Sequence, residues 1–196
     1  MRVQGQMTTE KYRAIDLSLF ALILMVFETV IVRAATQWFP KEAWTVSAVS
    51  AITAIVMVRW GPWAGIHAVL GGIVFVLTSR GGLNQYVIYG VGNLAGLAVL
   101  PLLKKWGWRK LKENVLVNFL YGALVLLGMQ VGRGLISLLF GASPAVALGF
   151  ITTDVISYIF TLVILWIVAR LDGMLEDQRH YLKRLSEQRE KEGGFQ

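Results

Sequence analysis

The feature that most constrains this chain is a series of six apolar runs, each close to the length that a helix needs to cross a bilayer. A spanning helix takes about 20 residues at about 1.5 Å of rise per residue. The sequence therefore predicts an all-α membrane protein, a bundle of six transmembrane helices. The second and third runs are short for a span. The runs are Ala14–Gln37, Ala43–Val58, Trp63–Ser79, Gln85–Leu103, Asn114–Leu139 and Ala145–Ala169.

Composition supports a membrane-embedded chain. Of the 196 residues, 56% are hydrophobic and only 16% are charged, whereas about a quarter of a typical soluble domain is charged. The absence of cysteine excludes disulfides, Cys-ligated zinc, iron–sulfur clusters and a thiol nucleophile. We expect no cofactor and no metal. We interpret residues 1–171 as one membrane domain and residues 172–196 as a charged cytoplasmic tail, a helical extension of the sixth span.

The basic residues predict the orientation. Nearly all Lys and Arg flank the runs on one side, and the loops on the other side hold only Lys41 and Arg80. Because Lys and Arg concentrate in cytoplasmic loops, both termini are predicted to lie in the cytoplasm, with the chain crossing the membrane repeatedly. The net charge of +7 is then a topology signal. Because the basic residues flank the runs, where anionic lipid lies, we expect them to contact the lipid bilayer and not nucleic acid.

Three polar stripes lie in the outer halves of the last three runs, because residues three or four apart share a helix face. They are Tyr86, Tyr89 and Asn93; Gln130, Arg133 and Ser137; and Asp154, Ser157, Tyr158 and Thr161. A charge inside a bilayer costs several kcal/mol unless it is paired, solvated or used. Arg133 and Asp154 lie at similar depth, so they either form a structural ion pair or grip a polar ligand in a pocket that opens outward. Trp38 and Asn84 are further candidates for ligand contact, at the rim of that pocket.

Other polar and small residues have simpler interpretations. The charge nearest to Glu28 on the same run is five residues away and therefore lies on another face of the helix. The sequence identifies no partner for Glu28. His67 is interpreted as a satisfied core residue. Ala14, Ser18 and Ala21 form a strip of small residues near the cytoplasmic end of the first run, a candidate surface for docking a partner membrane protein.

Enzyme motifs are missing. The segment Gly141–Pro144 contains a serine, but it does not match the G-x-S-x-G of a nucleophile elbow, and we interpret it as a tight turn. We therefore expect no catalytic residues. The sequence also contains no phosphate-binding loop, so the chain cannot power transport by itself.

The overall pattern resembles the substrate-binding S component of an energy-coupling factor (ECF) transporter. The resemblance rests on six runs in under 200 residues, the Gly-Pro-x-x-Gly segment Gly61–Gly65, and the Leu-Asp-Gly sequence 171–173. It implies capture of a water-soluble micronutrient, such as a vitamin, from outside by helices four to six. It also implies partnership with a transmembrane T subunit and two cytoplasmic ATPase subunits, in the cytoplasmic membrane of a prokaryotic cell. Family members often carry two alanines four residues apart on helix one for T-subunit docking, whereas here Ser18 follows Ala14 at that spacing.

Two alternatives remain open. A non-transport membrane scaffold of the MreD type resembles S components in fold, and it would have a closed outer pocket with Arg133 paired to Asp154. An intramembrane enzyme would need a nucleophile or a metal cluster, and the sequence contains neither pattern.

Overall fold

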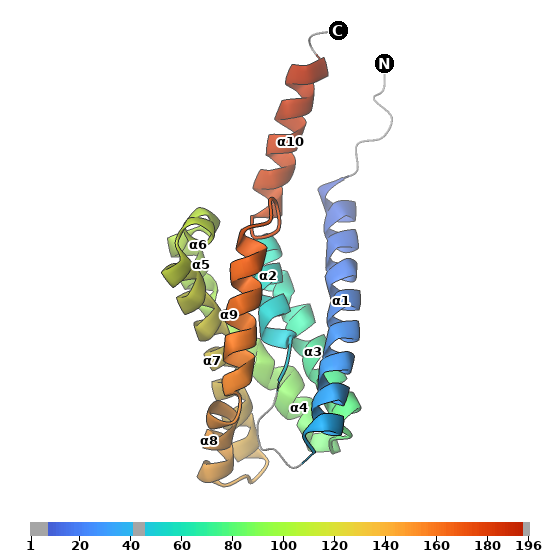
Figure 1. Ribbon diagram of the computed structural model, residues 1–196, viewed down its shortest axis with the longest axis vertical. Helices are drawn as coiled ribbons and strands as arrows, with labels where there is room; N and C mark the ends of the chain where they lie inside the picture. Colours follow the sequence, from blue (N-terminus) through green and yellow to red (C-terminus); the bar gives the residue numbers. More distant parts are fainter. Residues whose placement is uncertain (1–7, 41–45, 194–196) are drawn as a thin grey trace.

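The computed structural model describes residues 8–40 and 46–193, and all regular structure in those ranges is helical (Figure 1). The α-helices are α1 (Thr9–Trp38), α2 (Val49–Trp60), α3 (Ala64–Ser79), α4 (Leu83–Gly92), α5 (Leu100–Trp106), α6 (Trp108–Glu113), α7 (Val115–Leu139), α8 (Pro144–Thr152), α9 (Val155–Ala169) and α10 (Gln178–Gly193), with 3₁₀ segments η1 (Gly61–Trp63) and η2 (Asn93–Val99). Five helical stretches of the described chain are long and apolar enough to cross a membrane: Thr9–Trp38, Val49–Ser79, Leu83–Trp106, Val115–Leu139 and Pro144–Ala169. The all-α membrane bundle predicted from the sequence is thus confirmed.

The stretch Val49–Ser79 folds back on itself. Gly61 adopts a left-handed φ of 61°, which a residue without a Cβ tolerates, and the 3₁₀ turn η1 reverses the chain. As a result α3 runs antiparallel to α2, and a Cβ on Gly71 would lie 2.6 Å from a methyl of Val49. Every residue of α2 is buried. The second apolar run is short because its helix, only 12 residues long, begins inside the bundle.

Two runs that we expected to be continuous helices are interrupted. Between α4 and α5 lies η2, a 3₁₀ segment of seven residues, which is long for a conformation usually limited to three or four. Between α8 and α9 the helix breaks at Thr153 and Asp154. Non-helical backbone at membrane depth is tolerated where it is buried in protein, and both breaks meet α7.

Small residues allow α7 to approach α4 and η2 closely. A Cβ on Gly132 would overlap the carbonyl oxygen of Gly92, and one on Gly128 would lie 2.9 Å from the carbonyl oxygen of Ala95. Close approach of backbones increases dispersion contacts between membrane helices. The small-residue positions therefore determine how α7 is seated against both.

The start of α1 and the whole of α10 lie at the same end of the bundle (Figure 1). α10 follows a turn at Gly173, whose φ is 69°, so the tail helix is separate from α9. Arg59 at the end of α2 donates to the carbonyl oxygens of Gly173 and Met174 at 2.6 and 3.0 Å, which holds this turn on the bundle. Lys41, expected in the opposite loop, lies outside the described residues.

Candidate ligand-binding site

Arg133, on α7, joins the two helix breaks. Its Nε donates to Oδ1 of Asn93, the first residue of η2, at 2.7 Å. Its Nη1 donates to Oδ2 of Asp154, between α8 and α9, at 3.3 Å. All three side chains are buried. The fold therefore places a buried guanidinium between an amide and a carboxylate that both lie where a helix is interrupted.

Asp154 is surrounded by donors. Besides Arg133, its carboxylate accepts from Gln130 Nε2 at 3.3 Å and from Ser157 Oγ at 2.6 Å. Tyr158 in turn donates its hydroxyl to Gln130 Oε1 at 2.7 Å. Asp154 also precedes the first residue of α9, where the helix dipole favours negative charge. These contacts offset the cost of burying the carboxylate.

Glu28 enters the same network from α1. One carboxylate oxygen accepts from Ser47 Oγ at 2.8 Å and the other from the backbone N–H of Ala48 at 2.7 Å. The backbone N–H of Ser47 donates to Ser157 Oγ at 3.1 Å, which links this pair to Asp154. These are the partners that the sequence did not identify for Glu28. They lie in a non-helical segment, where residue spacing carries no information about faces.

An aromatic group covers the other side of the guanidinium. Arg133 lies 4.9 Å from the ring centre of Tyr89, a distance typical of cation–π contact. The Tyr89 ring stacks on Phe75 at 4.6 Å and meets the edge of Phe150 at 5.8 Å. We did not identify Phe75 or Phe150 from the sequence, because single phenylalanines in apolar runs carry no signal of their own.

The space enclosed by this cluster is small. A cavity of about 10 Å³ lies between Ser47, Phe75, Tyr89, Arg133 and Asp154, which is about the room that one water molecule needs. In the described structure the polar side chains of the cluster therefore bind one another and leave no room for a larger ligand. The chemistry of the cluster would suit a flat polar ligand: a guanidinium and a carboxylate beside an aromatic face.

Three candidate residues lie apart from the cluster. Trp38 is 73% exposed at the end of α1, Asn84 is exposed on α4, and Tyr86 is half-buried on the same helix. In the part of the chain that the structure describes, no hydrogen bond or ring contact joins them to the cluster. The candidates brought together are Tyr89, Asn93, Gln130, Arg133, Asp154 and Tyr158.

Of the other residues discussed from the sequence, His67 is fully buried on α3, and its Nε2 lies 3.0 Å from the carbonyl oxygen of Leu17. Ala14 and Ser18 are exposed on α1, and Ala21 is partly buried, so part of the small-residue strip is accessible. Within residues 8–40 and 46–193 no group of three or more acidic or histidine side chains is arranged to hold a metal ion.

No protein-family model matches the chain, and neither a curated protein nor a solved structure matches it.

Proposed function

We propose that this protein is the substrate-binding S component of an ECF-type importer and captures a water-soluble vitamin or related micronutrient. The observation that carries the proposal is the position of Arg133, buried between two interrupted helices. Interrupted helices that meet at a polar cluster are typical of binding sites in membrane transporters. In this proposal α2 and α3 are separate crossings, which gives six, and both termini lie in the cytoplasm. The ligand enters from the opposite side of a prokaryotic cytoplasmic membrane.

Binding requires the cluster to open. Ligand pockets usually enclose about 300–1,000 Å³, far more than the cavity of about 10 Å³ beside Arg133. The ligand therefore takes the place of the ion pair between Arg133 and Asp154. A ligand acceptor binds the guanidinium, a ligand donor binds the carboxylate, and a flat ring stacks against Tyr89. The breaks before Asp154 and at Asn93 are where the backbone can move without breaking a regular helix.

The partners follow from the same proposal. Since the sequence has no phosphate-binding loop, energy comes from two cytoplasmic ATPase subunits through a T subunit. The exposed small residues Ala14 and Ser18, with the partly buried Ala21, form the surface on α1 that contacts the T subunit. Small residues suit this role because they let two membrane helices approach closely.

A scaffold of the MreD type is the second candidate, and a specific observation favours it. The ion pair between Arg133 and Asp154 is already formed, and the cavity beside it is only about 10 Å³, as expected of a cluster that only stabilises the bundle. In that case replacing Arg133 changes stability and has no effect on a bound molecule, because none is bound.

The test is purification of the full-length protein in mild detergent, followed by mass spectrometry of any small molecule that accompanies it. Arg133→Gln is the test variant, and Arg80→Gln is the matched control, since Arg80 is exposed at the end of α3. A charged hydrogen bond contributes about 1.5–3 kcal/mol, so Arg133→Gln should lower retention by about 10-fold or more. The control should retain the molecule as the wild type does.

Two results would refute parts of this proposal. Equal retention by Arg133→Gln and wild type would mean that the ligand binds elsewhere. If the wild type carries no small molecule and recovers no ATPase subunits in a pull-down from its native membrane, the transport function is wrong and the scaffold is favoured.

A further inference from the structure

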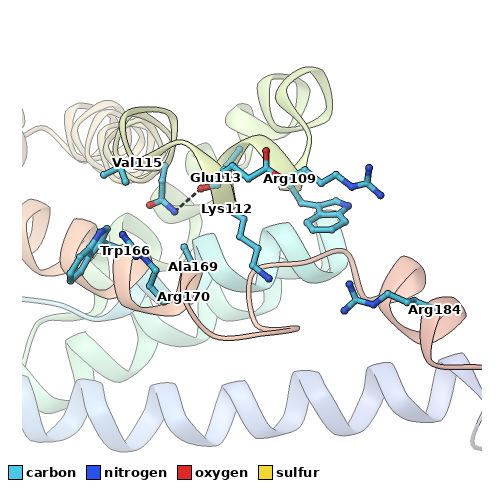
Figure 2. Close-up of a pocket in the computed structure, with 11 residues that line it drawn as sticks. Arg109, Lys112, Glu113, Val115, Trp166, Ala169, Arg170 and Arg184 are labelled. Atoms are coloured by element: carbon cyan, nitrogen blue, oxygen red, sulfur yellow. Dashed lines mark hydrogen bonds between the residues drawn. The ribbon is translucent and has the colours of Figure 1, made fainter. Parts of the chain in front are cut away.

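A second, larger pocket lies at the opposite end of the bundle, beside the start of α10. It has a volume of about 620 Å³ and is formed by α6, the start of α7, the end of α9, and α10. Figure 2 shows the side chains that line it, with Arg109 and Lys112 on the α6 side and Arg184 reaching in from α10. This pocket contains no residue of the Arg133 cluster, so an inference about it is independent of the proposed transport function.

The lining is strongly basic. Four cationic side chains, Arg109, Lys112, Arg170 and Arg184, face one acidic side chain, Glu113. Asp172 and Glu176 lie beside this lining and pair with Lys112 and Arg184, so the site keeps an excess of one positive charge. A net positive charge in a concave site attracts anions, because the low-dielectric walls focus the field of the cations.

Two of these cations are free of carboxylate partners. Lys112 and Arg184 both contact Asp172, at 3.3 and 3.7 Å. In contrast, no ion pair involves Arg109 or Arg170 among the residues that the structure describes. Each guanidinium instead lies over a tryptophan, Arg109 over Trp108 at 5.4 Å and Arg170 over Trp166 at 5.2 Å. Stacking leaves the N–H groups at the edge of a guanidinium available for an anion.

The wall of the pocket contains one buried acceptor without a partner among the described residues. Asn118 lines the pocket and is 1% exposed. Its Nδ2 donates to the carbonyl oxygens of Leu111 and Leu165 at 3.1 and 3.5 Å. Its Oδ1 is buried without a hydrogen-bond partner in the described chain. Buried polar atoms are nearly always paired, and this oxygen is covered by the wall of the pocket, so an entering ligand does not reach it unless the wall moves.

The surroundings of the pocket are those of a membrane interface. Val115 and Leu116 at the start of α7 are 42% and 76% exposed, and Trp166 is 42% exposed. Tryptophan is enriched at the boundary between lipid and water. Exposed apolar side chains beside a basic cavity provide a surface for acyl chains next to a site for phosphate.

We propose that this pocket binds the headgroup of an anionic glycerophospholipid. Its phosphate lies against Arg109 and Arg170, and its acyl chains lie against the neighbouring apolar surface. Basic pockets between helices on the cytoplasmic side of a membrane commonly hold such headgroups. A free phosphate ion shares the charge chemistry but makes no use of the neighbouring apolar surface, and the test separates the two.

The test measures lipid retention by native mass spectrometry of the full-length protein in detergent, with phosphatidylglycerol or phosphatidylcholine added. The test variant is Arg109→Gln/Arg170→Gln. Its matched control is Lys105→Gln/Lys110→Gln, which removes the same charge from exposed residues that do not line this pocket. A direct charged hydrogen bond to the phosphate is worth about tenfold or more in affinity, whereas a cation that only lies near the membrane surface is worth about fivefold at most. The test variant should therefore lose about 100-fold or more in phosphatidylglycerol retention, and the control should lose clearly less, about 30-fold at most.

Three results would overturn the proposal. Equal losses in the two double variants would mean a diffuse attraction to the charged end of the bundle. Equal retention of phosphatidylglycerol and phosphatidylcholine by the wild type would exclude recognition of negative charge. Binding of inorganic phosphate that depends on Arg109 and Arg170, without preferential retention of phosphatidylglycerol, would assign the pocket to a free anion.

Discussion

Replacing Asp16 by Asn should strongly destabilise the bundle, because Asp16 is the counter-ion of a buried arginine. Its carboxylate accepts from Arg59 Nε at 2.9 Å, from Arg59 Nη2 at 2.7 Å and from Trp60 Nε1 at 2.6 Å. Arg59 is 5% exposed, and its remaining donors hold the carbonyl oxygens of Gly173 and Met174. This one pair thus connects α1, α2 and the turn before α10.

The magnitude follows from what the substitution leaves behind. Asn keeps the shape of the side chain and one acceptor oxygen, but the guanidinium of Arg59 stays buried without a counter-charge. Breaking one partner of a buried ion pair costs about 3–5 kcal/mol. Because the remaining oxygen of Asn can still accept a hydrogen bond, we expect a loss of about 3 kcal/mol in the free energy of unfolding.

The assay is unfolding of the purified protein in mixed micelles by increasing SDS, followed by circular dichroism. The matched control is Asp172→Asn, which also removes one carboxylate, in this case from the surface ion pairs with Lys112 and Arg184. Asp172 is 75% exposed, and such surface pairs contribute only about 0–1 kcal/mol. If the two variants unfold within about 1 kcal/mol of each other, the view of Asp16 as a buried counter-ion is wrong.

Two further substitutions test the packing of the bundle by the same assay. Gly132→Ala should lower the free energy of unfolding by about 1–3 kcal/mol, the usual effect of overpacking, because the added Cβ overlaps the carbonyl oxygen of Gly92. The control Gly149→Ala should be nearly neutral, because a Cβ there meets nothing within 4 Å. Equal effects of the two substitutions would contradict the close approach of α7 to α4. Tyr121→Phe should cost about 1 kcal/mol, since the buried hydroxyl donates to the carbonyl oxygen of Ala54 at 2.8 Å, and an unchanged unfolding curve would show that this bond contributes nothing.

Helical spacing in the sequence was informative where helices are regular. Gln130 and Arg133 share a face of the uninterrupted α7, and the structure brings both to Asp154. The break beside Asp154 was missed, because neither Gly nor Pro marks it. The available signal is Thr152-Thr153, whose hydroxyls bond back to helix carbonyls at 3.4 and 2.7 Å. Such bonds compete with helical pairing.

Helical spacing could not predict the positions of the residues expected at the rim of the candidate site, for a different reason. Asn84 lies in the first turn of α4 and Trp38 is the last residue of α1. At a helix end, the direction of the chain that follows decides which side chains meet. Spacing within one run carries no information about that direction, whereas Tyr89, two turns into the bundle, is held by neighbours on three sides.

Two buried charged side chains, Glu28 and Arg59, have a common role, which is to satisfy non-helical backbone; the sequence identified no partner for Glu28. Glu28 accepts from the N–H of Ala48, the residue that precedes α2, so a carboxylate from another helix supplies the acceptor that a helix N-terminus lacks. Arg59 performs the complementary role, since it donates to the carbonyl oxygens of Gly173 and Met174 in the turn after α9. A negative group at a helix start and a positive group beyond a helix end both match the helix dipole. Glu28, a charge within an apolar run, is therefore needed because α2 begins inside the protein, and Arg59, just after the second run, is needed because the chain after α9 turns there.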